Sequence, residues 1–187
     1  MLIQLKDFFK FFVDFSEEEL SAVWDFFYPQ KLKKGEHLCS PGEVATEIGF
    51  VLKGAFRIYY LIGEKETTRY LGLENSFITS IPSFTTQKPS IEHVEALENC
   101  DMLMLSFQNL QTMYTMSAKW ERLVRLMAEY SYNEQQARIY SLIALSAQQR
   151  YEKFIKGNPK IVQRVPQYII ANYLGISPET LSRIRKQ

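Results

Sequence analysis

The chain has few residues of the kinds that hold metal ions or form disulfide bonds. Its 187 residues include two cysteines, Cys39 and Cys100, and two histidines, His37 and His93. An iron–sulfur cluster needs four thiolates, so two distant cysteines exclude it, and in a reducing compartment we expect both as free buried thiols. Two histidines are too few for a three-histidine metal site. We expect each as an ordinary polar residue of a strand or loop, and we predict no metal ligands.

Long apolar runs are missing too. No stretch approaches the roughly 20 apolar residues that span a bilayer. The N-terminal MLIQLKDFFKFFVDF is interrupted by charged residues, and it lacks the apolar region and cleavage site of a signal peptide. We therefore expect a cytoplasmic protein with no membrane partner, in which these aromatic residues form one packed face of a helix.

Residue groupings typical of enzymes are also missing. We find no Ser/His/Asp arrangement with usable spacing, no histidine-rich cluster and no phosphate-binding glycine loop. We predict no catalytic residues and no enzymatic activity. A cupin-like barrel enzyme is the alternative of this class, and stoichiometric iron or zinc in the purified protein would support it.

Charge is distributed unevenly along the chain. Residues 147–187 hold eight Lys or Arg and two Asp or Glu, whereas residues 1–146 hold fourteen basic and nineteen acidic residues. The net charge of +1 therefore hides a basic tail on an acidic body. Neutralisation of phosphates supplies most non-specific DNA affinity, so this tail favours a nucleic-acid partner. RNA or an acidic membrane surface would also attract it, but neither explains the turn pattern that follows.

The last 22 residues, PQYIIANYLGISPETLSRIRKQ, have the pattern of two short helices joined by a tight turn. Gly175 ends the first helix, because glycine tolerates the left-handed backbone of a sharp turn. Ser177 is a good N-cap and Pro178 occupies the first position of the second helix. That helix buries Leu181 and Ile184 and exposes a polar, basic face. Such a face on a second helix is what insertion into the major groove of DNA requires.

Residues 29–107 predict short strands separated by glycines. Segments 49–52 and 55–60 flank Lys53-Gly54, which indicates a hairpin, and residues 64–70 pair after Gly63. Residues 91–97 and 102–105 predict later strands. Short strands at regular spacing are typical of a barrel, a sandwich or a β-roll.

Helices are predicted on both sides of this region. Ser16 and Glu19 have the spacing of a capping box, residues 108–115 and 147–156 predict short helices, and residues 117–146 lack Gly and Pro and predict one long helix. A turn follows at 157–159. Apolar residues on two faces of the long helix suit packing against its own domain and against a second copy. The apolar stripe consists of Trp120, Leu123, Val124, Met127, Tyr130, Ala137, Tyr140, Ile143 and Ala144.

This order of parts resembles the cyclic-AMP receptor protein/FNR (Crp/Fnr) family of bacterial transcription regulators over essentially the whole chain. KGEHL (34–38), PGE (41–43) and FVLKG (50–54) are similar to the glycine framework of the family's β-roll, and LGISPETLSR (174–183) is similar to its helix-turn-helix. The resemblance implies an α+β fold in three parts. Residues 1–116 would form a double-stranded β-helix or jelly roll, the cyclic-nucleotide-binding-like β-roll. Residues 117–146 would form a dimerisation helix and residues 147–187 a winged-helix-type helix-turn-helix domain.

The resemblance also implies that Glu179 and Arg183 read DNA bases. Residues four apart share one helix face, Arg binds guanine O6 and N7, and Glu accepts from cytosine N4. Pro178 stands where the receptor branch carries Arg, so one base contact is lost and the operator is not implied. The alternative is a plain surface pair between Glu179 and Arg183. The predicted DNA-binding residues are Ser177, Glu179, Thr180, Ser182, Arg183 and Lys186.

The sequence departs from the family at the ligand pocket. Nucleotide-binding members grip the ligand with a Gly-Glu-Leu turn and a later Arg-Ser; the matching stretches here read FITSI (77–81) and KPSIE (88–92), with no Arg. A buried phosphate without a paired cation is costly, so we expect no binding of cyclic AMP in the usual way. The β-roll would hold another small-molecule effector or be a structural relic. The candidate pocket residues are Arg57, Tyr59, Arg69, Phe77, Thr79, Ser80, Lys88 and Ser90.

Together these patterns predict a homodimeric transcription regulator that reads a near-palindrome on double-stranded DNA, with RNA polymerase as a further partner. The competing function is a small-ligand-binding or interaction β-roll protein whose tail has lost DNA binding. That function predicts no salt-dependent DNA affinity and no effect of Arg183→Ala.

Overall fold

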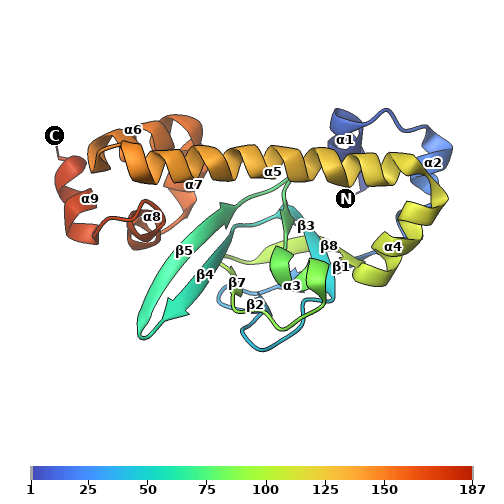
Figure 1. Cartoon of the computed structure of the whole chain (residues 1–187), viewed down its shortest axis with the longest axis horizontal. Helices are drawn as coiled ribbons and strands as arrows, with labels where there is room; N and C mark the ends of the chain where they lie inside the picture. The colour runs from blue at the N-terminus through green and yellow to red at the C-terminus, as the bar shows by residue number, and fades with distance from the viewer. Residues whose placement is uncertain (1, 187) are drawn as a thin grey trace.

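A computed structural model describes residues 2–186 and shows an α+β fold arranged along one long helix (Figure 1). This helix, α5 (Ala118–Ala144), has 27 residues, so at the usual rise it is about 40 Å long. The strands lie beside its middle. Helices α1 (Leu2–Phe12) and α2 (Glu17–Ser21) lie at one end of α5, and the C-terminal helices lie at the other.

Two four-stranded antiparallel sheets form the β-roll. The first sheet has the order β1 (Phe27–Leu32), β8 (Cys100–Ser106), β3 (Glu47–Lys53), β6 (Phe77–Ile78). The second has the order β2 (His37–Cys39), β7 (His93–Ala96), β4 (Phe56–Ile62), β5 (Lys65–Gly72). A 3-10 turn, η1 (Trp24–Phe26), precedes β1, helix α3 (Ile81–Thr86) joins β6 to β7, and α4 (Phe107–Met116) joins β8 to α5. This is the β-roll that the family resemblance implies.

The expected hairpin at Lys53-Gly54 is wrong. Strands β3 and β4 lie in different sheets, and Gly54, at φ +126°, carries the chain from one sheet to the other. The hairpin is β4–β5, which turns at Gly63. A tight turn and a crossover between sheets both need a backbone that glycine tolerates. The local sequence therefore does not distinguish them; here both strands bury apolar residues between the sheets.

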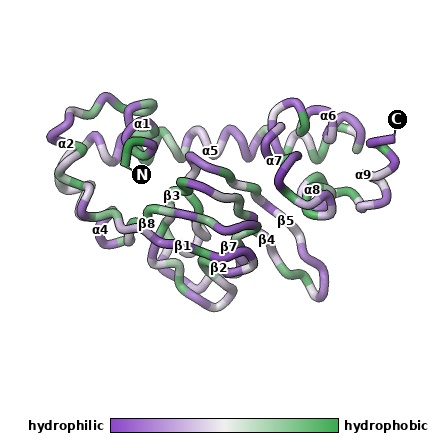
Figure 2. Tube along the Cα trace, turned by 180° about the vertical axis from the view of Figure 1, so that it is seen from behind, coloured by the Kyte–Doolittle hydropathy of each residue, from purple (hydrophilic) through white to green (hydrophobic). Residues whose placement is uncertain are grey.

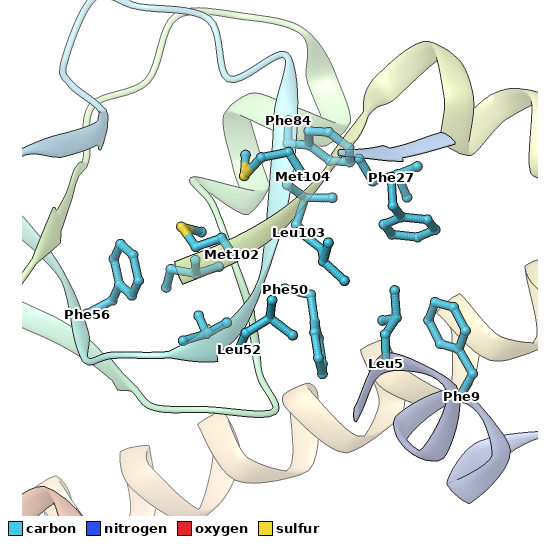
Figure 3. Close-up of a cluster of buried hydrophobic side chains, with 14 of the residues drawn as sticks. Leu5, Phe9, Phe27, Phe50, Leu52, Phe56, Phe84, Met102, Leu103 and Met104 are labelled. Carbon is cyan, nitrogen blue, oxygen red and sulfur yellow. The ribbon is translucent and has the colours of Figure 1, made fainter. Parts of the chain in front are cut away.

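An apolar core fills the space between the sheets and continues to α1 and α5 (Figure 3). Phe50 and Met102 have no exposed surface, and Leu5 and Phe9 extend this core from α1. Trp120 of α5 is also buried and stacks on Phe15 at 4.2 Å between ring centroids. Each such side chain contributes about 1.5–3 kcal/mol of burial free energy. Phe9 of α1 thus packs in the core as expected, whereas Phe11 of the same helix is 80% exposed.

Caps define several helix boundaries. The capping box of Ser16 and Glu19 is confirmed, and Ser146 and Gln149 form a second one at the start of α6 (Ala147–Gly157). Pro159 does not only end a turn: it starts a further helix, α7 (Pro159–Arg164), which the sequence pattern did not predict. Proline is well suited to the first position of a helix because the N–H it lacks would be unpaired there.

The C-terminal helices have a second, smaller core. Phe154, Ile161, Ile170 and Leu181 are buried there together with Leu71 of β5. Helices α8 (Gln167–Tyr173) and α9 (Pro178–Ile184) follow α7, as the helix-turn-helix pattern predicts. Within residues 2–186 no strand follows α9. Hydrophilic residues predominate along α6 and towards the end of α9 (Figure 2).

Polar contacts fasten these helices to the β-roll. Arg164 of α7 pairs with Glu74 at 2.8 Å and also with Glu98. The Asn172 side chain of α8 accepts from the Thr68 N–H and donates to the Glu66 carbonyl of β5. Arg138 of α5 donates to the carbonyls of Tyr173 and Thr68. These contacts hold α8 against β5.

Candidate nucleic-acid interface and effector site

A tight turn sets α9 against α8. Gly175 has φ +67°, and the Ile176 N–H donates to the Ala171 carbonyl at 3.0 Å, which closes the end of α8. Ser177 then caps α9 by accepting from the Thr180 N–H at 3.2 Å. Leu181 is buried, so its position decides which face of α9 points outward.

The outward face of α9 carries the predicted DNA-binding residues. Ser177, Glu179, Ser182, Arg183 and Lys186 are exposed, and Thr180 is half-buried at the start of the helix. Arg185 is exposed as well and was not among the predicted residues. Arg185 lies two residues beyond the family motif at 174–183, so the resemblance did not indicate it. Its positive charge was the only signal in the sequence that could have identified it.

Glu179 and Arg183 are both available for a partner. A hydrogen bond from Ser177 lowers the pKa of Glu179 below its ordinary value, so this carboxylate is ionised and accepts hydrogen bonds at neutral pH. No ion pair in the described part of the chain joins Glu179 to Arg183. Both side chains are exposed, so each can reach a partner.

Further positive charge lies around α9. Lys153, Lys156 and Lys160 are exposed on α6 and α7, whereas Arg164 is neutralised by its two glutamates. A surface hollow of about 430 Å³ adjoins α9. It is lined by Gln167, Pro178, Leu181, Ser182, Arg185 and Lys186. A polyanion at this end of the molecule would meet cations from three helices.

Helix α5 presents a regular apolar face that nothing in the described chain covers. Residues at spacings of 4, 4, 3 and 4 share one helix face, and we name this face the α5 seam. Its members are Ala128, Tyr132, Gln136, Ile139 and Ile143, and all are exposed, Ile143 to 81%. The first residues of the expected stripe, Trp120 and Leu123, are buried in the β-roll core instead. Of the seam residues only Ile143 belongs to the expected stripe, whose Tyr130 and Tyr140 are exposed outside the seam.

The candidate pocket residues divide into separate groups. Arg69, Ser80 and Ser90 come together, and their common partner is Glu92, which is 1% exposed. Tyr60 joins them with a hydrogen bond of 2.8 Å to Glu92. Glu92 was not among the predicted pocket residues, because a carboxylate is not expected at a position that binds phosphate.

Arg57 and Tyr59 belong to a second cluster. Arg57 is 5% exposed and donates to Glu66 at 2.5 Å and to Glu95 at 2.7 Å. Its guanidinium lies 4.1 Å from the centre of the Tyr59 ring, which stacks on His93. Because Arg57 is paired with both carboxylates, the cluster has no unpaired cation for an anionic ligand.

The remaining candidates, Phe77, Thr79 and Lys88, lie outside these two clusters. Phe77 packs in the core against Phe8 and Phe50, because α1 covers that part of the sheet. Thr79 is buried and donates to the Glu47 carbonyl, and Lys88 is exposed. Sequence spacing alone places these residues near the turn but does not show which way each side chain points.

The cysteines and histidines lie on or beside strands. Cys39 and Cys100 are free and buried, and burial raises the pKa of the Cys100 thiol to about 11. His37 and His93 lie on β2 and β7. Within residues 2–186 no three His, Cys, Asp or Glu side chains are grouped to hold a metal ion. No helix in the same range is both long and apolar enough to cross a membrane.

Residues 29–116 match the protein family described as "Cyclic nucleotide-binding domain". No curated protein matches the sequence. Solved structures share the fold over nearly the whole chain. FixK2 from Bradyrhizobium japonicum has a TM-score of 0.75 and 17% identity, and the match covers 86% of this chain and 83% of that one.

Two further structures extend this likeness to regulators. The c-di-GMP responsive global regulator CLP of Xanthomonas campestris has a TM-score of 0.74 and 14% identity, covering 91% of this chain and 90% of that one. A structure from Eubacterium rectale described as a regulator of the crp/fnr family has a TM-score of 0.72 and 18% identity, covering 96% and 86%. At these identities the likeness establishes the fold.

Proposed function

We propose that this protein is a DNA-binding transcription regulator. The proposal starts from two findings: residues 29–116 match the cyclic nucleotide-binding domain family, and the chain has the Crp/Fnr-type fold. The observation that carries the proposal is the exposed face of α9, on which Glu179, Ser182 and Arg183 point away from the core. Its helix enters the major groove, Arg183 binds a guanine and Glu179 accepts from a cytosine. Ser177 and Thr180 contact phosphates at the helix start.

The active species in this proposal is a homodimer that pairs through the α5 seam. The seam leaves isoleucines and a tyrosine in water, which favours a second copy on this face. A two-fold axis through α5 gives two copies of α9, which read half-sites about one DNA turn apart. The β-roll is the effector domain, and cyclic AMP is not bound in the usual way. We place the protein in the cytoplasm, with RNA polymerase as a further partner.

The test is selection of bound sequences from random double-stranded DNA, for the wild type and for Arg183→Ala. We expect a two-fold symmetric motif for the wild type. Arg183→Ala should lose about 1–3 kcal/mol of binding free energy per half-site at the guanine that Arg183 contacts. Arg122→Ala is the control, since Arg122 is exposed on α5 far from α9, and it should select the wild-type motif.

Two other outcomes separate the competing functions. A wild type that selects no motif, with or without small molecules from a cell extract, points to a ligand-binding or interaction protein. A motif that appears only with the extract shows that an effector gates binding, as a population shift between competent and incompetent arrangements.

A further inference from the structure

A buried carboxylate lies at the centre of a set of anion-binding groups in the β-roll. The groups come from three parts of the chain: Tyr60 on β4, Arg69 on β5, and Ser80 at the start of α3. All point at Glu92, which precedes β7 and is 1% exposed. We name Tyr60, Arg69 and Ser80 the anion cradle.

Both carboxylate oxygens of Glu92 accept hydrogen bonds from the cradle residues. Oε1 accepts from Arg69 Nε at 2.7 Å and from Tyr60 Oη at 2.8 Å. Oε2 accepts from Ser80 Oγ at 2.8 Å and from Arg69 Nη2 at 3.3 Å. A guanidinium with converging hydroxyls is the donor set that binds a carboxylate or a phosphate. The cradle is thus satisfied from within the chain.

The surrounding groups support this arrangement. Ser80 is the N-cap of α3, yet its hydroxyl does not cap that helix and donates to Glu92 instead. Ser90 accepts from the Glu92 N–H at 2.9 Å and lies 3.0 Å from Ser80 Oγ, which orients both residues. Ser80 and Ser90 are 1% and 4% exposed, so water does not compete for these bonds.

We infer that Glu92 is a built-in occupant of the anion cradle: its carboxylate takes the place of an external carboxylate or phosphate, and the β-roll keeps its shape without such a ligand. A phosphate ligand would have to displace Glu92 and leave that carboxylate buried without its cation, which is costly. The inference deepens the proposed role of the β-roll as an effector domain and rests on it.

The test removes the carboxylate of Glu92 by substitution and supplies it again as a free anion. Glu92→Ala removes one CH2 and the carboxylate, and acetate is this fragment as a free anion. We expect Glu92→Ala to melt at a lower temperature than the wild type in sodium chloride. Sodium acetate at the same ionic strength should stabilise the variant, by about tenfold in its folded-to-unfolded ratio for 100 mM acetate and a Kd of about 10 mM. The wild type should show no difference between the two salts.

Two controls make the result specific. Glu92→Gln fills the same space, so acetate should not stabilise it over chloride. In the double variant Glu92→Ala, Arg69→Ala the cradle has no cation, and the acetate effect should vanish. If Glu92→Ala does not stay folded in chloride, the yield of refolded protein in acetate and in chloride gives the same comparison.

Equal behaviour of Glu92→Ala in acetate and chloride would overturn the inference. So would binding of cyclic AMP or inorganic phosphate by the wild type, measured by calorimetry, that Arg69→Ala abolishes. If inorganic phosphate stabilises Glu92→Ala as acetate does, this would support the inference. It would also show that the cradle binds both carboxylates and phosphates. Because the readout is stability and not DNA binding, its failure is distinct from a failure of the proposed DNA-binding function.

Discussion

Gly54 shows how one residue without a side chain shapes the β-roll. It lies at the crossing between the sheets with φ +126°, and a Cβ there would be 2.3 Å from Cys100 Sγ and 3.0 Å from Cys100 Cα. Its N–H also donates to Glu74 at 2.9 Å. Close approach of two backbones and a left-handed conformation are needed at the same position, and only glycine meets both needs.

We expect Gly54→Ala to lower the free energy of unfolding by about 3 kcal/mol or more, from backbone strain together with overpacking against Cys100. Gly157→Ala is the matched control. No atom lies within 4 Å of its added Cβ, so its effect should stay within about 1 kcal/mol. Urea unfolding of both variants measures this, and equal effects of the two substitutions would contradict the role of Gly54.

Among the elements, the contact of α7 with the β-roll includes a two-point ion pair between Arg164 and Glu74. The two terminal nitrogens of Arg164 donate to the two oxygens of Glu74, each at 2.8 Å. This hydrogen bonding lowers the pKa of Glu74 to about 2. Both side chains are about three-quarters buried, so the pair is screened less than a surface salt bridge. It ties α7 to the β-roll.

The pH dependence of stability follows from this pKa. The folded-state value, about 2, lies below the ordinary 4.5, so ionised Glu74 stabilises the fold above about pH 4.5 and this contribution is lost as the pH falls towards 2. We expect Glu74→Gln to lower the free energy of unfolding by about 1–3 kcal/mol at pH 7. The difference from the wild type should shrink steadily between pH 5 and pH 2.

Urea unfolding across this pH range measures the effect. Glu64→Gln is the control, because Glu64 is exposed in the β4–β5 turn and has no ion pair among the described residues. It should differ little from the wild type at every pH. A Glu74→Gln deficit that stays constant down to pH 2 would show that charge at Glu74 is not its cause.

In the molecule as a whole, the α5 seam leaves large apolar side chains exposed along one helix face. Tyr132, Ile139 and Ile143 are 63%, 47% and 81% exposed along one face. A hollow of about 420 Å³ lined by Arg125, Ala128, Glu129, Tyr132 and Asn133 adjoins its first half. Side chains of a second α5 would enter this hollow as knobs enter holes in coiled coils.

We expect Ile143→Glu to convert the dimer to a monomer of 21.9 kDa, since two buried glutamates would face each other across the seam. Ile91→Glu is the control: Ile91 is 74% exposed but lies in the β-roll, away from the seam. Sedimentation equilibrium measures the mass of both variants. A wild type that is already monomeric at micromolar concentration would contradict the dimer.

Local features of this protein were determined by the sequence alone. The capping box of Ser16, the turn at Gly175 and the long helix without Gly or Pro all depend on residues within a few positions of one another. Helix propensity and turn chemistry act over that range. The polar, basic face of the second C-terminal helix could be predicted for the same reason.

Only the tertiary structure decided which distant residues meet. Gly54 crosses between sheets instead of closing a hairpin because β3 pairs with β8 and β6, whereas β4 pairs with β7 and β5. Arg69 and Glu92 are 23 residues apart, and Arg164 and Glu74 are 90 apart. Such pairs depend on how the sheets and helices pack, and no local spacing encodes them. The same packing buries one end of the long helix and leaves the α5 seam exposed.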